Sequence, residues 1–180
     1  QLHTNDSELA RAVSRIKKEY PKNRLVGQLA RCGQEYRCLC ARNFFLSRYE
    51  APIPTSPVCN ARCLGCLSYQ QKEVSGFCES QYRLEFAPEP EEIAQVILHH
   101  FERVDNAVAS FGQGCEGEPL LRGKALAKVI RMVRGKTDRG TIHLNTNGSM
   151  PELATEMIDA GLDSIRVSLN SPTRAYYDAY

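Results

Sequence analysis

The stretch APIPTSPVCNARCLGC, residues 51–66, places three cysteines directly after an extended segment rich in proline. Proline lacks a backbone N–H, so residues 51–58 suit an edge strand or a first strand better than a central one. Cys59, Cys63 and Cys66 follow with the spacing C-x₃-C-x₂-C. A strand that leads straight into a group of thiols predicts both where the sheet begins and where its chemistry lies.

Downstream of this stretch, helical and strand patterns alternate. Apolar residues recur at helical spacing over residues 88–101, 126–135 and 149–161. Strands are predicted over residues 106–111, 141–145 and 164–169, and residues 171–180 begin a further helix. Ser149 to Glu152 is a predicted capping box. Alternation of this kind predicts an α/β domain with a parallel sheet built by right-handed crossovers.

The N-terminal third differs from the rest of the chain. Residues 7–20 have the spacing of a short helix, with Ser7 as its predicted cap. Residues 24–50 show no clear period. We therefore predict an N-terminal extension over residues 1–50 and an α/β core over residues 51–180. Because the chain lacks an initial Met and stops abruptly, we expect it to be a fragment of a longer protein.

Two predicted strands carry polar side chains on one face, although strands of a parallel sheet are usually buried on both faces. In the last strand, Ile165, Val167 and Leu169 alternate with Arg166, Ser168 and Asn170. In the strand before it, Ile142 and Leu144 alternate with His143 and Asn145. One interpretation is a sheet with one face in water. The alternation with helices favours another, a curved sheet or barrel that holds a polar ligand at the carboxyl ends of its strands.

Composition argues against several classes of partner. The chain has 180 residues, of which 42% are hydrophobic and 24% charged, and a net charge of +2 gives no reason to expect a nucleic acid. No apolar run approaches the roughly 20 residues that span a bilayer. The first residues do not resemble a signal peptide. Eight cysteines without an export signal favour metal ligands or catalytic thiols, so we expect a cytoplasmic protein with no membrane partner.

The number of clustered thiols narrows the kind of metal site. A structural zinc site takes four ligands, so a fourth such as Cys78 would have to join Cys59, Cys63 and Cys66. An iron–sulfur cubane held by three cysteines instead leaves one iron without a protein ligand, open to a substrate or cofactor. Chance is a poor explanation for three cysteines within eight residues. Spacing alone leaves zinc and iron–sulfur open.

Four segments together resemble the signature of the radical S-adenosylmethionine (radical SAM) superfamily. The first is Cys59–Cys66, and the others, in the family's order, are Gly117–Leu121 (GEPLL), Asn145–Gly148 (NTNG) and Ile165–Asn170 (IRVSLN). The resemblance covers about residues 51–180. It implies a partial (β/α)₆ TIM-like barrel, of which only the first four βα units are present.

The resemblance also implies a role for each matching residue. Cys59, Cys63 and Cys66 would ligate three irons of a [4Fe–4S] cluster, and the amino and carboxylate groups of SAM would chelate the fourth. Glu118, with the backbone near Gly117, would meet the SAM amino group. The other implied contacts to SAM come from Asn145, Asn147, Arg166, Ser168 and Asn170.

The reaction that the resemblance implies is reductive cleavage of SAM. An electron passed through the cluster breaks the S–C5′ bond, and a 5′-deoxyadenosyl radical takes a hydrogen atom from the substrate. Such an oxidoreductase or transferase would receive electrons from a donor such as a flavodoxin or ferredoxin. Its substrate is unidentified, with peptides and proteins among the candidates. The alternative is a non-catalytic iron–sulfur or zinc-binding module, which would have no need of Glu118, Ser168 or Asn170.

Two residues depart from the family pattern. Gly65 replaces the bulky or aromatic residue that often precedes the third cysteine and lies near the adenine. Glu116 stands where a glycine is common, and beside it Cys115 would contact the substrate or serve as a small hydrophobe.

Other cysteines and histidines have weaker patterns. Cys32, Cys38 and Cys40, with Cys78 as a fourth ligand, are a candidate second metal site, the alternative being unrelated buried or surface thiols. His99 and His100 are predicted to be a surface or interface pair, because adjacent helical residues diverge. His143 either contacts SAM or substrate or is a satisfied interior histidine.

Overall fold

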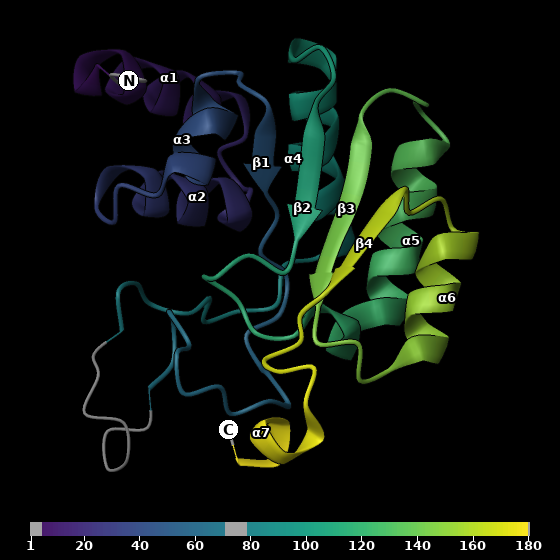
Figure 1. Cartoon of the computed structure of the whole chain (residues 1–180). Helices are drawn as coiled ribbons and strands as arrows, with labels where there is room; N and C mark the ends of the chain where they lie inside the picture. The colour runs from purple at the N-terminus through teal and green to yellow at the C-terminus, as the bar shows by residue number, and fades with distance from the viewer. Residues whose placement is uncertain (1–4, 71–78, 180) are drawn as a thin grey trace.

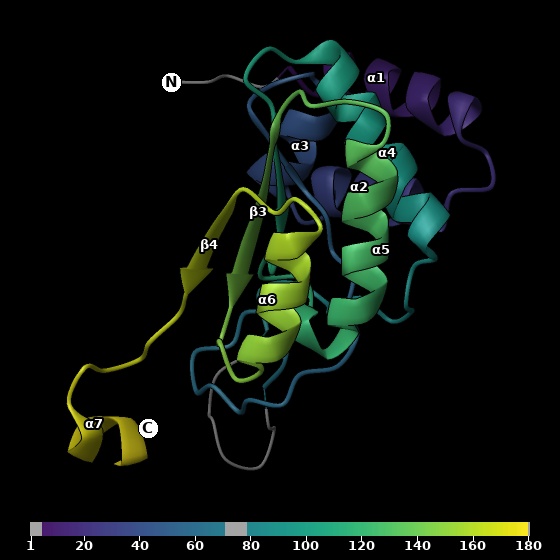
Figure 2. The same ribbon diagram turned by 90° about the vertical axis from the view of Figure 1, so that its right-hand side faces the viewer.

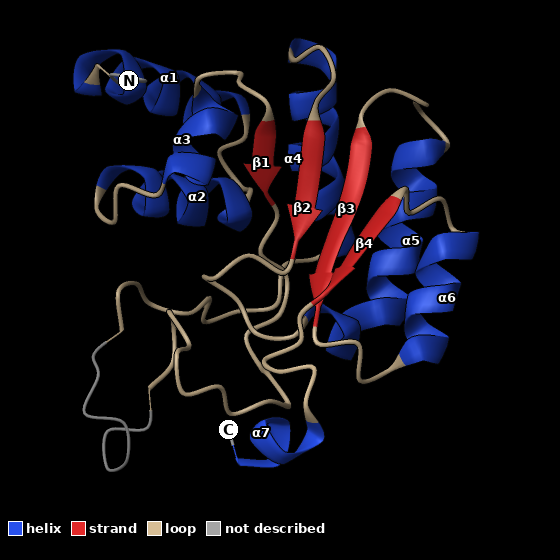
Figure 3. Cartoon of the chain, in the orientation of Figure 1, coloured by secondary structure: helices blue, strands red, loops and turns tan. Residues whose placement is uncertain are grey.

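The computed structural model describes residues 5–70 and 79–179 (Figure 1). Its centre is a sheet of four parallel strands in chain order, β1-β2-β3-β4. The strands are β1 (Glu50–Pro52), β2 (Val108–Phe111), β3 (Thr141–Thr146) and β4 (Ser164–Val167). Their carboxyl ends point toward one edge of the sheet, as the arrowheads in Figure 3 show. The parallel sheet predicted from the alternating pattern is therefore confirmed.

A helix lies in each connection between consecutive strands. These helices are α4 (Pro90–Arg103), α5 (Gly123–Arg134, after the 3₁₀ helix Pro119–Arg122) and α6 (Pro151–Asp159), and they cover one face of the sheet (Figure 2). α1 (Asp6–Glu19), α2 (Arg24–Gln34) and α3 (Leu39–Phe45) lie on the β1 side of the sheet, and α7 (Arg174–Ala179) follows β4. The architecture is consistent with a partial barrel, whose closure stays a prediction.

The sheet has an apolar layer because small and large side chains line up in register. Ala51, Ala109 and Ile142 are neighbours across three strands, and all are fully buried. Phe111 and Leu144 form a second buried pair nearer the carboxyl ends. These side chains join the apolar stripes of α4 and α5 in one core, so the carboxyl edge is held by a close-packed support.

The first strand is much shorter than the predicted residues 51–58. β1 spans only Glu50–Pro52, and just beyond it the Ile53 N–H still donates to the Ser110 carbonyl (2.8 Å). The prolines that follow supply no N–H, so the ladder ends there. Its position at the edge of the sheet agrees with the sequence prediction.

Two predicted helix caps are wrong. α1 is capped by Asn5, whose Oδ1 accepts from the Ser7 N–H (3.0 Å), because Ser7 already lies inside the helix. α6 starts after Met150 without a side-chain cap. Ser149 instead donates its N–H to Asn147 Oδ1 (3.0 Å) in the turn that leaves β3.

Residues 24–50, which show no clear period, form α2 and α3 and dock on α4. Asn23 caps α2 by accepting from the Val26 N–H (3.1 Å). Its amide donates to the Glu92 carbonyl and to Gln95 Oε1 on α4, both at 2.9 Å. Beside it the Arg24 guanidinium bonds to the Glu92 carboxylate (2.6 Å) and lowers the pKa of Glu92 to about 2. Helices α1–α3 share one apolar core with the sheet, and the predicted boundary at residue 50 stays a prediction.

We expect Asn23→Ala to lower the free energy of unfolding by about 2 kcal/mol, because it removes a buried helix cap and two partly buried bonds between helices. Asn5→Ala is the matched control, since Asn5 is an exposed cap whose side-chain bonds within the described residues go only to Ser7 of α1. It should cost about 1 kcal/mol or less. Urea unfolding followed by circular dichroism measures both. Equal losses in the two variants would show that Asn23 contributes only as a cap.

The prediction that His99 and His100 form a surface or interface pair is wrong, because both are packed inside the chain. Both side chains are buried, at 2% and 1% exposure. Tyr20 at the end of α1 bonds His99 Nδ1 (3.1 Å), while Phe44 of α3 packs against both rings. His100 Nε2 bonds the Tyr49 carbonyl (2.9 Å). Adjacent helical residues do diverge, but α1 and α3 cover the side of α4 that would otherwise face water.

Burial makes these histidines a source of acid sensitivity. Desolvation, followed by repulsion from Arg103, lowers the pKa of His99 to about 4, and desolvation also lowers the pKa of His100. The folded state therefore binds fewer protons than the unfolded state below pH 6.5, so stability falls as the pH drops from about 6.5 toward 4. His99 contributes at most about 3 kcal/mol of this loss.

His99→Phe should flatten that pH dependence, because phenylalanine fills the aromatic site between Tyr20 and Phe44 without titrating. Urea unfolding at pH 7 and pH 5 measures the difference for both proteins. A variant whose stability falls as steeply as that of the wild type would assign the acid sensitivity to other groups.

β4 does not have the predicted apolar side packed against helices. Ile165 and Val167 are 40% and 56% exposed, and Arg166 on the other side is exposed as well. β3 fits the prediction better, since Ile142 and Leu144 are buried and His143 is only partly covered. In the described residues, no helix has the length and apolar character needed to cross a membrane.

Candidate functional site

The segment of residues 59–66, which contains the predicted cysteine ligands, lies beyond the carboxyl ends of the strands (Figure 1). Cys59, Cys63 and Cys66 fall between β1 and α4 in a segment without regular structure. The Cys66 N–H donates to the Cys63 carbonyl (3.2 Å), which closes a tight turn over Leu64 and Gly65. All three cysteines are reduced and partly exposed. The loop therefore presents its thiols at the edge where parallel sheets bind ligands.

The three thiols influence one another electrostatically. Burial, and then the neighbouring Cys59 and Cys66, raise the pKa of Cys63. Burial also disfavours the Cys66 thiolate, but hydrogen bonds from Ser68 and the charge of Arg83 outweigh it, so the pKa of Cys66 is lowered. The Arg83 Nη2 lies 3.3 Å from the Cys66 sulfur. Closely spaced thiols beside a cation favour binding of a metal that neutralises several thiolates at once.

The three cysteine sulfurs are suitable ligands for a metal, although they do not converge on a common point in this structure. Across residues 5–70 and 79–179, no three His, Cys, Asp or Glu side chains converge as a group that could hold a metal ion. The loop supplies three soft sulfur donors, which fit zinc or iron–sulfur chemistry. Because metal binding and local folding are coupled, such a loop can complete its ligand geometry on binding.

The Gly117–Glu118 segment packs directly on the backbone that leads into the cysteines. The Gly117 N–H donates to the Ser56 carbonyl (2.7 Å), and the Glu118 N–H donates to the Val58 carbonyl (2.9 Å). A Cβ at Gly117 would lie 1.9 Å from the Val58 oxygen and 2.9 Å from the Cys59 nitrogen. Glycine is required here because the two backbones touch.

The Glu118 carboxylate is buried and joins the loop to the end of β3. One oxygen accepts from the Leu120 N–H (3.0 Å) and from the Thr146 hydroxyl. The other oxygen accepts from the Asn147 N–H (2.8 Å). At 4% exposure, Glu118 thus holds two of the predicted site segments together. The Glu118 oxygen that accepts from the Asn147 N–H can accept one more hydrogen bond, since each carboxylate oxygen has two lone pairs.

Asn60 is a site residue that the sequence did not reveal. It lies between the first two cysteines, and its Oδ1 accepts from the Asn147 amide (2.8 Å) while its own amide donates to the Ser149 hydroxyl (2.8 Å). These bonds tie the cysteine loop to the segment after β3. The motif spacing leaves this position unspecified, and its partners are 87 and 89 residues away, so no local signal could have found it.

The remaining residues predicted to contact SAM differ in how close they lie to the cysteine loop and in how exposed they are. Asn170 lies near enough to the Cys63 thiol to favour its thiolate, which opposes the rise in the pKa of Cys63. The amide of Asn145 is buried and donates to the Phe111 carbonyl (3.1 Å), and its Oδ1 lies 3.3 Å from His143 Nε2. Arg166 and Ser168 are exposed on and beyond β4. The structure thus brings Asn170, Glu118 and Asn147 toward the cysteine loop.

Glu116 is a second residue whose role the sequence did not reveal. It is 5% exposed, and its carboxylate accepts from groups of Thr55, Ser56 and Gly112. Burial raises the pKa of Glu116 to about 7, although these hydrogen bonds oppose the shift. Because this position holds Glu116 instead of the glycine common in the family, a carboxylate connects the residues that follow β1 with the residue that follows β2.

The other cysteines form two contacts. The Cys32 thiol on α2 shares a hydrogen bond with Cys115, which lowers the pKa of Cys32 and raises that of Cys115. A hydrogen bond between Cys38 and Cys40 lowers the pKa of Cys38. Cys115 is therefore a buried neighbour of α2, at 3% exposure. The predicted fourth ligand, Cys78, lies outside the described residues, and the second metal site stays a prediction.

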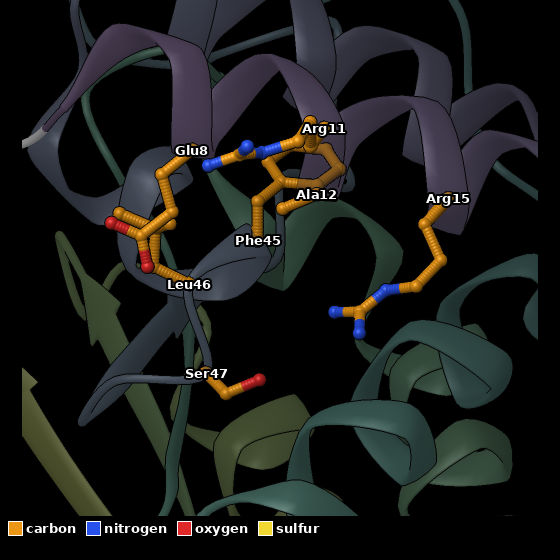
Figure 4. A pocket seen from close by; sticks show the side chains of 7 residues that line it. All are labelled: Glu8, Arg11, Ala12, Arg15, Phe45, Leu46 and Ser47. Atoms are coloured by element: carbon orange, nitrogen blue, oxygen red, sulfur yellow. The ribbon is translucent and has the colours of Figure 1, made fainter.

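A surface hollow of about 280 Å³ lies away from the cysteine loop, between α1 and the turn after α3 (Figure 4). Its lining consists of Glu8, Arg11, Ala12, Arg15, Phe45, Leu46 and Ser47. It contains no thiol and is built from the opposite end of the molecule, at the amino ends of the strands (Figure 1). It therefore adds nothing to the chemistry of the candidate site.

Comparison with known families bears on this geometry directly. A family model described as the Radical SAM superfamily matches residues 53–180. No curated protein is found to match the chain. The matched range includes the cysteine loop, the Gly117–Glu118 segment and the strands β2 to β4, so it contains every residue of the candidate site.

Proposed function

The chain belongs to the radical SAM superfamily, and from this premise we propose that it is an enzyme that cleaves SAM reductively by means of a [4Fe–4S] cluster. Members of the superfamily generally use these two cofactors. The observation that carries the proposal is the direct packing of the Gly117–Glu118 backbone on Val58 and Cys59. A metal-binding module alone would not need this contact.

In the proposed enzyme, Cys59, Cys63 and Cys66 hold the cluster through their sulfurs. A bound cluster and SAM together supply one-electron chemistry that converts SAM into methionine and 5′-deoxyadenosine, with a hydrogen atom taken from the substrate. Arg83, 3.3 Å from the Cys66 sulfur, offsets negative charge at one ligand. Asn60 fixes the loop against Asn147, which limits the positions the sulfurs can take.

Recognition of SAM is assigned to the groups that surround the loop. The Glu118 oxygen that bonds to Asn147 would accept a hydrogen bond from the SAM amino group, while the bonds of the carboxylate to Thr146 and Asn147 hold it in place. Gly117 lets the backbone approach closely. Asn170, next to Cys63, and the more exposed Ser168 and Arg166 are proposed to bind the ribose and carboxylate.

The test is anaerobic reconstitution with iron and sulfide, followed by addition of SAM and dithionite. We expect about four irons and four sulfides per chain, broad absorption typical of a cluster, and production of 5′-deoxyadenosine. A protein that contains zinc but no iron, and that shows no cluster absorption, would contradict the proposal and favour a structural zinc module. Cluster assembly without any effect of SAM would favour a non-catalytic iron–sulfur module.

Several finer features of the proposal depend on the same test. A reducing cytoplasm and an electron donor such as a flavodoxin or ferredoxin would suit a cluster held by partly exposed thiols. The substrate class is left to experiment, with peptides and proteins as the first candidates. Iron beyond four per chain would support the second metal site at Cys32, Cys38 and Cys40.

A further inference from the structure

Glu116 is a buried carboxylate with no direct role in the proposed reaction. One of its oxygens accepts from the Thr55 N–H (2.6 Å), the Thr55 hydroxyl (2.9 Å) and the Ser56 N–H (2.8 Å). The other oxygen accepts from the Gly112 N–H (2.6 Å). All four of these groups donate hydrogen bonds, so the site requires a side chain that accepts hydrogen bonds through both of its terminal oxygens.

The groups that Glu116 joins belong to two separate segments. Thr55 and Ser56 follow β1 and lead to Cys59 within three residues. Gly112 follows β2, adopts a φ of +75° and packs against the Asn145 carbonyl. The ladder between β1 and β2 ends at Pro52, and the last backbone bond across the gap comes from Ile53. Beyond that point the two segments are joined by the Glu116 side chain and by the backbone bonds of Gly117 and Glu118.

The bridge stands directly before the site segments. Immediately after Glu116, the Gly117 and Glu118 N–H groups bond to the Ser56 and Val58 carbonyls. A displacement of Ser56 would therefore move the entry to the cysteine loop and the Gly117–Glu118 segment relative to each other. The Arg122 guanidinium donates to the Thr55 carbonyl (3.0 Å) and fixes this residue from the other side.

We propose that Glu116 is a positioning residue that sets the cysteine loop at the correct distance and orientation from the Gly117–Glu118 segment. The inference rests on the proposed function. A glutamine has the same size, but its NH₂ group would replace one of the two oxygens. That NH₂ group would then face an N–H or O–H donor, and a hydrogen bond would be lost to repulsion between two donors. Small misplacements of this kind reduce binding and catalysis out of proportion to their effect on folding.

The experiment compares Glu116→Gln with Glu92→Gln in the reconstituted protein. Glu92 is a matched control because it also accepts several hydrogen bonds, from Arg24 and the Glu89 N–H, and neither partner belongs to the cysteine loop or to the Gly112–Glu118 segment. Measured for each are the melting temperature, the iron content, the dissociation constant for SAM, and the change that SAM causes in the electron paramagnetic resonance signal of the reduced cluster.

Both variants should lose a similar amount of thermal stability. Only Glu116→Gln should weaken SAM binding, by about tenfold or more, and alter the SAM-dependent signal while iron is retained. Equal SAM affinity in the two variants at equal loss of stability would overturn the proposal. If Glu116→Gln does not fold, Glu116→Asp decides, because the shorter carboxylate reaches only one of the two segments. Wild-type binding of SAM by that variant would also overturn it. A wild-type protein that shows no response to SAM would instead count against the proposed function.

Discussion

Cys63→Ala is expected to abolish assembly of the cluster and formation of 5′-deoxyadenosine. Three cysteines are the minimum that the proposed cluster uses, so loss of one leaves a second iron without a protein ligand. Cys63 is also the thiol whose pKa is affected by both Cys59 and Cys66. Iron and sulfide analysis and chromatography of the reaction products measure the two effects.

The matched control is Leu64→Ala, which alters the same turn without removing a ligand. Leu64 is 45% exposed between the second and third cysteines, so its truncation should leave iron content near the wild-type value. Persistence of 5′-deoxyadenosine in Cys63→Ala would mean that the ligand assignment is wrong. Equal loss of iron in both variants would point to collapse of the loop rather than loss of a ligand.

Gly117→Ala should be nearly as damaging, for a steric reason. The new Cβ would stand 1.9 Å from the oxygen and 2.3 Å from the carbon of the Val58 carbonyl. Both are backbone atoms, so the clash is relieved only by separating the Gly117–Glu118 segment from the cysteine loop. We expect a loss of about 3 kcal/mol in the free energy of unfolding, together with loss of detectable SAM binding.

Gly27→Ala tests the same substitution where space is open. A Cβ at Gly27, inside α2, meets nothing within 4 Å. Alanine should therefore stabilise the helix by about 0.5–1 kcal/mol and leave SAM binding unchanged. Urea unfolding and SAM titration on both variants measure the contrast. Normal SAM binding by Gly117→Ala would contradict the close approach of the two backbones.

Much of the fold could be predicted because its signals are local. The helices after residue 88 have apolar stripes that repeat within one element, and each lies between two short strands. The parallel order of β1 to β4 follows from that alternation. The prediction failed for α2 and α3. In α2 the apolar residues Leu25, Val26 and Leu29 do share one buried side, whereas α3 has only seven residues, too few to show a clear period. The prediction also failed for His99 and His100, because their burial depends on Tyr20 and Phe44 in other helices.

The same distinction applies to the candidate site: its motifs are local in the sequence, whereas the bonds that connect them join distant residues. The cysteine spacing and the GEPLL segment are visible in the sequence, and they led to the family that the comparison identifies. The bonds that connect these segments were not visible. Asn60 reaches residues more than 80 positions away, and Glu116 bonds to Thr55 across 61 positions. Sequence patterns name the groups, whereas only the packed chain shows which of them hold one another in place.

The strand order has a consequence for how the chain can fold during synthesis. Each new strand of this sheet pairs with the one made just before it, and none has to wait for a later segment to fill a gap between earlier strands. Helices α1–α3 precede the sheet in the chain and occupy the β1 side (Figure 1), so the sheet grows in one direction, toward β4. A ribosome could therefore deliver this protein one βα unit at a time, with the cysteine loop emerging before the segments that hold it.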